Sequence, residues 1–276
     1  FIYSIVISFL ILSLFHIFLF PELYLDSTIY NYWIKIIAQT KGLGFYEGGP
    51  SIGLGLSSNY PPLHSIIGAS IFSIFGENLL HLKVFSWLIF ISFILLIYKW
   101  SNELFANKKY TFYSILLFTT LPSIIFFSRA TSFYLLLAFL FTLTLYFFHK
   151  FYLTRKKSHL YISAIFAGLA SLTSYLGLLC LLLIPLAFTS KKQYKPLLIS
   201  VILFFLIISP WYLRNLIILG NPIWPFGGGN YIDSIIATST YNQLNEVSKI
   251  NGFNYETIEN LLNSLSRLLF SYVNFN

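Results

Sequence analysis

Long apolar runs constrain the fold of this chain more than any other feature. A helix needs about 20 apolar residues to cross the roughly 30 Å of bilayer hydrocarbon. Six runs approach or exceed that length: Phe1–Phe20, Leu79–Tyr98, Tyr110–Phe127, Thr131–Phe148, Leu160–Phe188 and Pro196–Tyr212. Only 9% of all residues are charged, against about a quarter in a soluble domain. The sequence therefore predicts an all-α polytopic membrane protein.

The run Leu160–Phe188 is long for one crossing and short for two, and Thr173-Ser174-Tyr175 interrupts its middle. Basic residues resolve the choice, because short cytoplasmic connections are rich in Lys and Arg. Three connections carry them: Lys99, Lys108 and Lys109; Lys150, Arg155, Lys156 and Lys157; and Lys191, Lys192 and Lys195. The last two flank this run, so it must cross twice, as short helices near 160–173 and 175–189. We therefore expect seven transmembrane helices.

This topology predicts a seven-span module over residues 1–212, with Phe1–Phe20 as an anchor helix and the amino terminus inside. Residues 21–78 and 213–276 lie outside, and we expect the latter segment to lead into further spans. The inner connections then hold ten basic residues and one acidic residue, and the outer side holds seven basic and eight acidic residues. The net charge of +8 therefore reflects insertion into a membrane and not attraction to nucleic acid.

Three segments on the outer side predict helices that lie in the membrane interface, among the lipid headgroups. In Asp26–Gly42, Asp26 or Ser27 can cap the start and Gly42 can end the helix. The predicted apolar face of that helix consists of Ile29, Trp33, Ile36, Ile37 and Thr40. Leu63–Phe75 is apolar but too short to cross, and Tyr255–Phe270 carries leucines at helical spacing.

Ionisable residues at the predicted outer boundary are the candidates for chemistry. Glu22 and Asp26 follow the first helix, where a carboxylate can act as a general base or bind a cation, although Asp26 can equally be a helix cap. Arg129 and Arg214 stand where two helices leave the membrane. Each can bind a substrate phosphate through forked hydrogen bonds or simply reach toward the lipid headgroups. His64 can contact a substrate or only pack. No pair of His or Cys has metal-ligand spacing, so no metal is predicted, although a divalent cation is compatible with the outer acids.

The contents of the spans disfavour transport. Only His16 lies well inside a run, whereas ion-coupled transporters usually bury acids or bases in the membrane. The chain also shows no inverted repeat of the kind that many transporters carry. A transporter of a lipid-linked substrate, or a non-catalytic membrane protein, is therefore the alternative to an enzyme.

Several short motifs occur in the order typical of one enzyme class. They are an early outer acid, Tyr60-Pro61-Pro62-Leu63, Ser128-Arg129-Ala130, Gly168–Thr173, and Pro210–Asn215 with Gly220–Phe226. Over about residues 1–230, the chain resembles membrane glycosyltransferases of the GT-C class, in the branch of the protein O-mannosyltransferases and the aminoarabinose transferases of lipid A. It lacks the acids that relatives often carry before the double proline and after Arg129. These departures leave the second carboxylate and a metal requirement open.

The resemblance implies an inverting glycosyltransferase of the cell membrane with its active site facing outside. Such an enzyme moves a sugar from a polyprenyl-phosphate carrier to a lipid, glycan or protein acceptor. The implied roles are Asp26 as general base and Arg129 and Arg214 as ligands of the donor phosphate. The possible substrate contacts are Glu22, Glu47, Tyr60, His64 and Trp211.

Cysteine labelling tests the predicted topology. Cysteines placed at positions 47 and 230 should react with a membrane-impermeant thiol reagent added outside intact cells. A cysteine at position 156 should react only after the membrane is opened, because the positive-inside rule places it in the cytoplasm. Cys180 is the one native cysteine, so labelling of the unchanged chain measures the background. The reverse labelling pattern would contradict the predicted orientation.

Overall fold

The computed structural model describes residues 25–40, 61–183, 194–219 and 221–223, together with Ile11, Leu14 and Ile17. These residues all belong to one compact unit, formed by residues 1–44 and 57–226. A second unit, formed by residues 45–56 and 227–276, lies outside the described part. The predicted helix Tyr255–Phe270 and most of the predicted anchor Phe1–Phe20 are outside it as well.

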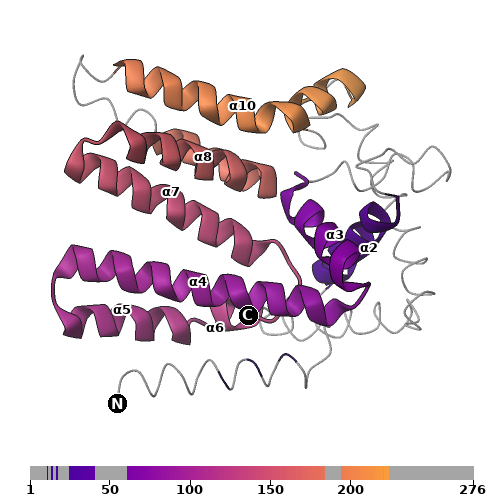
Figure 1. Cartoon of the computed structure of the whole chain (residues 1–276), viewed down its shortest axis with the longest axis horizontal. Coiled ribbons are helices and arrows are strands. Elements are labelled where there is room, and N and C mark those ends of the chain that lie inside the picture. The colour runs from indigo at the N-terminus through magenta and orange to yellow at the C-terminus, as the bar shows by residue number, and fades with distance from the viewer. Residues whose placement is uncertain are drawn as a thin grey trace, which may run out of the picture. The chain divides into compact units, whose positions relative to one another are not determined.

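Within the described residues every element is a helix and none is a strand (Figure 1). The helices are α2 (Leu25–Thr40), α3 (Leu63–Phe75), α4 (Leu79–Phe105), α5 (Lys108–Thr120), α6 (Pro122–Phe127), α7 (Tyr134–Thr154), α8 (Lys157–Thr173), η2 (Tyr175–Leu182, a 3₁₀ helix) and α10 (Tyr194–Leu219). Among them α4, α7 and the Tyr194–Ile217 part of α10 are long and apolar enough to cross a membrane. The predicted all-α polytopic fold is thus confirmed, and the count of seven crossings stays a prediction.

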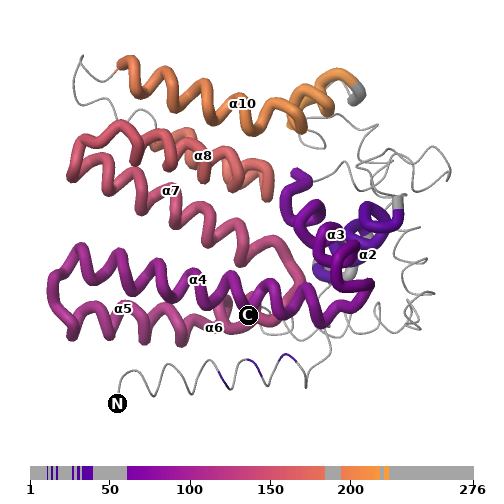
Figure 2. The backbone as a smooth tube through the Cα atoms, viewed as in Figure 1, coloured from indigo at the N-terminus to yellow at the C-terminus, as the bar shows by residue number. Residues whose placement is uncertain are grey.

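Two tight turns make neighbouring helices antiparallel (Figure 2). Ala106 and Asn107 join α4 to α5, and Arg155 and Lys156 join α7 to α8. Ala106 and Arg155 adopt left-handed backbone conformations, with φ of 47° and 56°. This conformation is common at helix ends, where N–H groups that follow the helix donate back to its last carbonyls. Each turn therefore returns the chain along the helix that precedes it.

An ion pair between α4 and α7 places these two turns at the same end of the helices. Lys150 Nζ lies 3.1 Å from Glu103 Oε1, and Tyr146 donates its hydroxyl to the same oxygen at 3.1 Å. Both charged partners lie in the last two turns of their helices. Two of the three basic connections therefore share one end, which agrees with the sequence-based assignment of both to one side of the membrane.

The long run Leu160–Phe188 breaks at Ser174, where the sequence predicted a break. Ser174 is extended (φ −159°, ψ 151°) and separates α8 from η2. The chain then lies close against the end of α8. A Cβ at Gly177 would overlap the backbone of Ala170 and Ser171. Only a glycine permits so close a return.

The run Tyr110–Phe127 is two helices and not the single span that the sequence predicted. Leu121 is extended (φ −64°, ψ 121°) between α5 and α6, and Pro122 is the first residue of α6. A proline disfavours helical backbone in the residue before it and cannot donate a hydrogen bond to the preceding turn. Pro122 therefore ends α5 and starts a new helix.

Helix α10 extends beyond the predicted end at Tyr212 and passes through Pro210. Proline has no N–H for the carbonyl four residues earlier, that of Leu206. The Ser209 hydroxyl donates to this carbonyl at 2.9 Å, so the freed acceptor is satisfied and the helix continues. Arg214, expected just beyond the helix, instead lies within its last two turns.

Helix α2 packs against α3 through a buried face that the sequence predicted only in part. Trp33 and Ile37 of the predicted apolar face are buried, and Tyr30 and Ile34 complete that face. Ile34 lies against Gly68 of α3, where a Cβ would come within 2.8 Å of its Cγ1 atom. The predicted bounds Leu63–Phe75 of α3 are confirmed.

The start of α2 differs from the prediction. The helix begins at Leu25, so Asp26 and Ser27 lie in its first turn and neither stands before it as a cap. Toward the other end of α2, Lys35 Nζ lies 3.2 Å from Glu77 Oε2, and Gln39 Nε2 donates to Glu77 Oε1 at 2.9 Å. Polar contacts thus join α2 to the residues between α3 and α4.

Replacing Gly177 with alanine tests the return of η2 along α8. The added methyl group would meet backbone atoms, which cannot move aside as a flexible side chain can. We expect the free energy of unfolding to fall by about 1–3 kcal/mol, measured by thermal unfolding in detergent. Leu179→Ala, at a half-exposed position of η2, is the matched control and should change stability less. An unchanged melting temperature in G177A would contradict the close approach.

Candidate functional site

Four parts of the chain meet at the end of the helices opposite the basic turns. They are α2, α3, the connection between α6 and α7, and the carboxy-terminal part of α10, and we call this region the α2 end. Tyr30 of α2 contacts Phe133 beside the start of α7, with ring centroids 5.0 Å apart. Helix α3 contacts α8, and Tyr212 of α10 donates its hydroxyl to the carbonyl of Ser171 near the end of α8 at 3.2 Å.

Arg129 lies in the turn that follows α6, at the α2 end. Its Nε donates to the carbonyl of Ile125 at 3.0 Å, and the Ser86 hydroxyl of α4 donates to the carbonyl of Ala130 at 2.8 Å. Partial burial lowers the pKa of Arg129 from its ordinary value, but an arginine side chain stays protonated in proteins. The turn therefore holds a positioned positive charge.

Arg214 is held by its neighbours on α10. Its Nη1 donates to Asn215 Oδ1 at 2.9 Å, and its guanidinium carbon lies 4.7 Å from the ring centroid of Trp211. Asn215 is fully buried and donates in turn to the Tyr175 hydroxyl at 3.3 Å. Of the residues predicted from the sequence, Arg214 and Trp211 are thus in direct contact.

His64 is buried on α3, with 5% of its surface exposed. Its ring lies edge-on to Tyr30 with centroids 5.7 Å apart, and its Nδ1 has no hydrogen-bond partner in the described part of the chain. Burial lowers the pKa of His64 from 6.5 to about 4, because the low-dielectric surroundings disfavour the charged form. His64 is therefore neutral near pH 7.

Three further polar groups at the α2 end were missed by the sequence analysis. Ser27 Oγ, Asn31 Oδ1 and Ser132 Oγ are buried, and within the described residues none has a hydrogen-bond partner. Ser27 and Asn31 are four residues apart on α2 and so share a helical face, a spacing that could have indicated them. Nothing in the sequence indicated that Ser132, the neighbour of Phe133, would lie in a segment that contacts α2.

A buried lysine was also missed. Lys83, in the second turn of α4, is only 9% exposed. It lies three residues before Ser86, which contacts the turn that carries Arg129. Its position near the start of an otherwise apolar run was the available signal, because an ionisable residue inside a span indicates function by default.

Three predicted site residues, Glu22, Glu47 and Tyr60, lie outside the described residues. Asp26 is placed in the first turn of α2, but its side chain is not described. Among the described residues, no three of the His, Cys, Asp and Glu side chains are grouped so that they could hold a metal ion.

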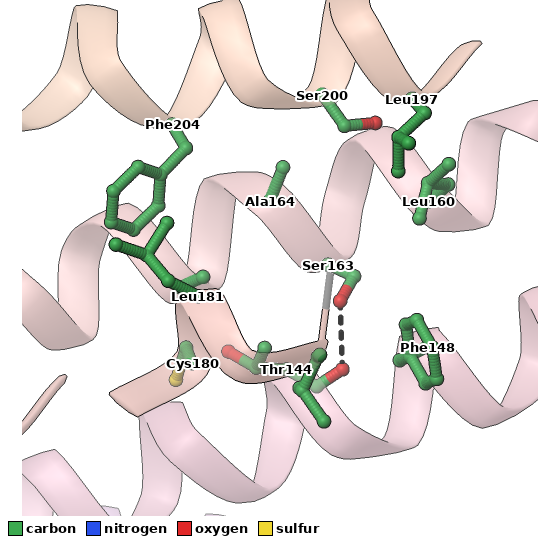
Figure 3. A pocket seen from close by; sticks show the side chains of 12 residues that line it. Thr144, Phe148, Leu160, Ser163, Ala164, Cys180, Leu181, Leu197, Ser200 and Phe204 are labelled. Carbon is green, nitrogen blue, oxygen red and sulfur yellow. Dashed lines mark hydrogen bonds between the residues drawn. The ribbon is translucent and has the colours of Figure 1, made fainter. Parts of the chain in front are cut away.

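Two cavities of the described part lie away from these residues. A small cavity of about 30 Å³ lies between α7, α8, η2 and α10 (Figure 3). The Ser163 hydroxyl donates across it to the carbonyl of Thr144 at 2.9 Å, and no charged residue lines it. A groove of about 340 Å³ between α4 and α5 likewise has no charged lining. Neither offers groups for transfer chemistry.

The fold and the site define a class, that of all-α membrane proteins with positioned arginines at one end of the helices. Residues 59–213, more than half of the chain, match the family described as dolichyl-phosphate-mannose-protein mannosyltransferase, and the chain belongs to this family. No curated protein and no solved structure matches the chain. Family membership confirms the resemblance to GT-C membrane glycosyltransferases, which use sugars carried on polyprenyl phosphates. Arg214 directly follows the matched residues, and Asp26 lies well before their start.

The buried neutral His64 predicts a pH-dependent stability. Between pH 6.5 and about 4 the unfolded chain binds a proton at His64 that the folded chain does not. The free energy of unfolding should therefore fall as the pH decreases through this window, by up to about 3 kcal/mol. Thermal unfolding in detergent at pH 7 and pH 4.5 measures the loss. His64→Asn should reduce the pH dependence, whereas Ser70→Ala, on an exposed position of α3, should preserve it. An equal loss in wild type and H64N would contradict the assignment.

Proposed function

We propose that this protein transfers a sugar from a polyprenyl-phosphate carrier to an acceptor on the outer face of the cell membrane. The observation that carries the proposal is the presence of Arg129 and Arg214 at the α2 end, in a chain of the mannosyltransferase family. The family's description makes mannose the first sugar to test. The acceptor is a lipid, a glycan or a protein.

The orientation in the membrane follows from charge. The turns at 106–107 and 155–156, with their neighbouring lysines, lie opposite the α2 end. Short connections rich in Lys and Arg remain in the cytoplasm. The α2 end therefore faces outside, which supports an outward-facing active site.

The two arginines bind the phosphate of the donor. A guanidinium presents two parallel N–H groups to phosphate oxygens, and Arg214 is oriented for this by Asn215 and Trp211. As the bond from the sugar's anomeric carbon to the phosphate oxygen breaks, negative charge develops on the leaving phosphate. Fixed positive charges lower the energy of that transition state.

Asp26 acts as the general base. Its carboxylate accepts the proton of the acceptor hydroxyl while that oxygen attacks the anomeric carbon, and the phosphate leaves from the opposite face with inversion. The packing of α2 on α3 and the contacts of Glu77 with Lys35 and Gln39 hold the helix that carries Asp26. The proposed contacts with the substrates are completed by Glu22, Glu47, Tyr60, His64 and Trp211.

Asp26→Asn tests the role of the base. The amide cannot accept the proton, so we expect the rate of sugar transfer to fall by roughly 10²–10⁴-fold, with binding of polyprenyl phosphate unchanged. Transfer is measured with radiolabelled polyprenyl-phosphate mannose and membranes of the source organism, which supply the acceptors. Glu103→Gln makes the same chemical change at the opposite end of the helices and should leave the rate within a few-fold. A D26N rate near that of wild type would show that another group is the base.

A further inference from the structure

Buried polar atoms without partners are concentrated at the α2 end. Ser27, His64 and Ser132 are 0%, 5% and 2% exposed, yet the hydroxyls of the two serines and Nδ1 of His64 make no hydrogen bond in the described part of the chain. Buried polar groups in proteins are nearly always hydrogen-bonded, and each exception needs an explanation. Several exceptions in one region indicate a ligand that supplies the missing partners.

Tyr30 connects the three separate parts of the sequence that carry these groups. Its ring contacts His64 of α3 at 5.7 Å and Phe133, the neighbour of Ser132, at 5.0 Å between centroids. Ser27 lies one turn before Tyr30 on the same side of α2, and Asn31, whose Oδ1 is also unpartnered among the described residues, follows Tyr30. The groups belong to α2, to α3 and to the connection before α7, so only tertiary packing brings them together.

The chemistry of this group suits a neutral ligand rich in hydroxyls. A serine hydroxyl and a neutral imidazole can each donate or accept, and the Asn31 oxygen accepts. None of the four side chains carries a charge near pH 7, because burial keeps the pKa of His64 at about 4. The rings of Trp33 and Phe133 pack against Tyr30, whose own ring contacts His64. Apolar walls with a few placed polar groups are typical of small-molecule sites.

We propose that Ser27, Asn31, His64 and Ser132, gathered around Tyr30, form the subsite that binds the hydroxyl groups of the transferred sugar. This inference rests on the proposed function, which needs a sugar at the α2 end beside the donor phosphate. The subsite selects its sugar by hydroxyl position, since an analogue that lacks a bonded hydroxyl leaves a buried group unpaired.

Binding measurements on the purified full chain in lipid nanodiscs test the subsite without an acceptor. The probes are polyprenyl-phosphate mannose, its four monodeoxy analogues (2-, 3-, 4- and 6-deoxy) and bare polyprenyl phosphate. We expect Ser132→Ala and His64→Leu each to weaken binding of the mannose donor about 3- to 10-fold. Binding of bare polyprenyl phosphate should not change, and this also shows that each variant is folded.

Two comparisons separate a sugar contact from a merely structural role. Each variant removes the side chain that should bond one sugar hydroxyl. The monodeoxy donor that lacks this hydroxyl should therefore bind equally weakly to the wild type and to the variant, because the hydrogen bond is already missing in the wild type. His64→Asn, which keeps a polar atom near the position of Nδ1, should restore much of the affinity lost in H64L. Ser70→Ala, at an exposed position of the same helix, should bind every probe as wild type does.

The outcomes distinguish the subsite from the proposed function. The subsite is overturned if a variant binds the mannose donor and bare polyprenyl phosphate with equally weakened affinity. It is also overturned if wild type binds all four deoxy donors as tightly as the mannose donor. In either case the unpartnered atoms are bonded to buried water and not to a sugar. A wild-type chain that binds the donor with hydroxyl selectivity but transfers no sugar overturns the proposed function and supports the subsite.

Discussion

The absence of water from bilayer hydrocarbon is the constraint on which the rest of this structure depends. A polar group inside it must find its partner within the protein. Hydroxyls along the helices accordingly donate to carbonyls of the preceding turn, as Ser92 does to Leu88 and Thr142 to Ala138. Where Pro210 removes a donor, Ser209 satisfies the freed carbonyl. These helices thus pair their polar groups internally, and unpaired polar atoms in the same region would be costly.

Against that background, the α2 end differs from the rest of the described helices. It combines two arginines held by local contacts with buried serine, asparagine and histidine atoms that lack partners among the described residues. Ion pairs occur at both ends, as Lys35 with Glu77 and Lys150 with Glu103 show, so the unpartnered polar atoms are what sets the α2 end apart. The ligand that we propose for the α2 end would account for both the fixed charges and the unpaired atoms, and it is consistent with membership of the dolichyl-phosphate-mannose-protein mannosyltransferase family.

Sequence reasoning predicted helices well where hydrophobic length and turn residues decide them. It placed α3 at its observed bounds and the break at Ser174, since a double proline and a polar interruption are local signals. It was wrong where the end of an apolar run does not coincide with the end of a helix. The run Tyr110–Phe127 is apolar along most of its length but Pro122 divides it, and α10 continues past Pro210 because a side-chain hydroxyl replaces the missing bond.

The sequence by itself determined the membrane class, the end of the helices that carries the basic turns, and the motif order that indicates the family. These properties depend on apolar length, charge bias and short local patterns, all of which can be read along the chain. Only the tertiary structure decided which side chains surround Tyr30, and that Ser27, His64 and Ser132 are buried with polar atoms unpartnered among the described residues. Such groupings depend on how α2 and α3 pack against the start of α7, and contacts between distant segments leave no periodic signal in the sequence.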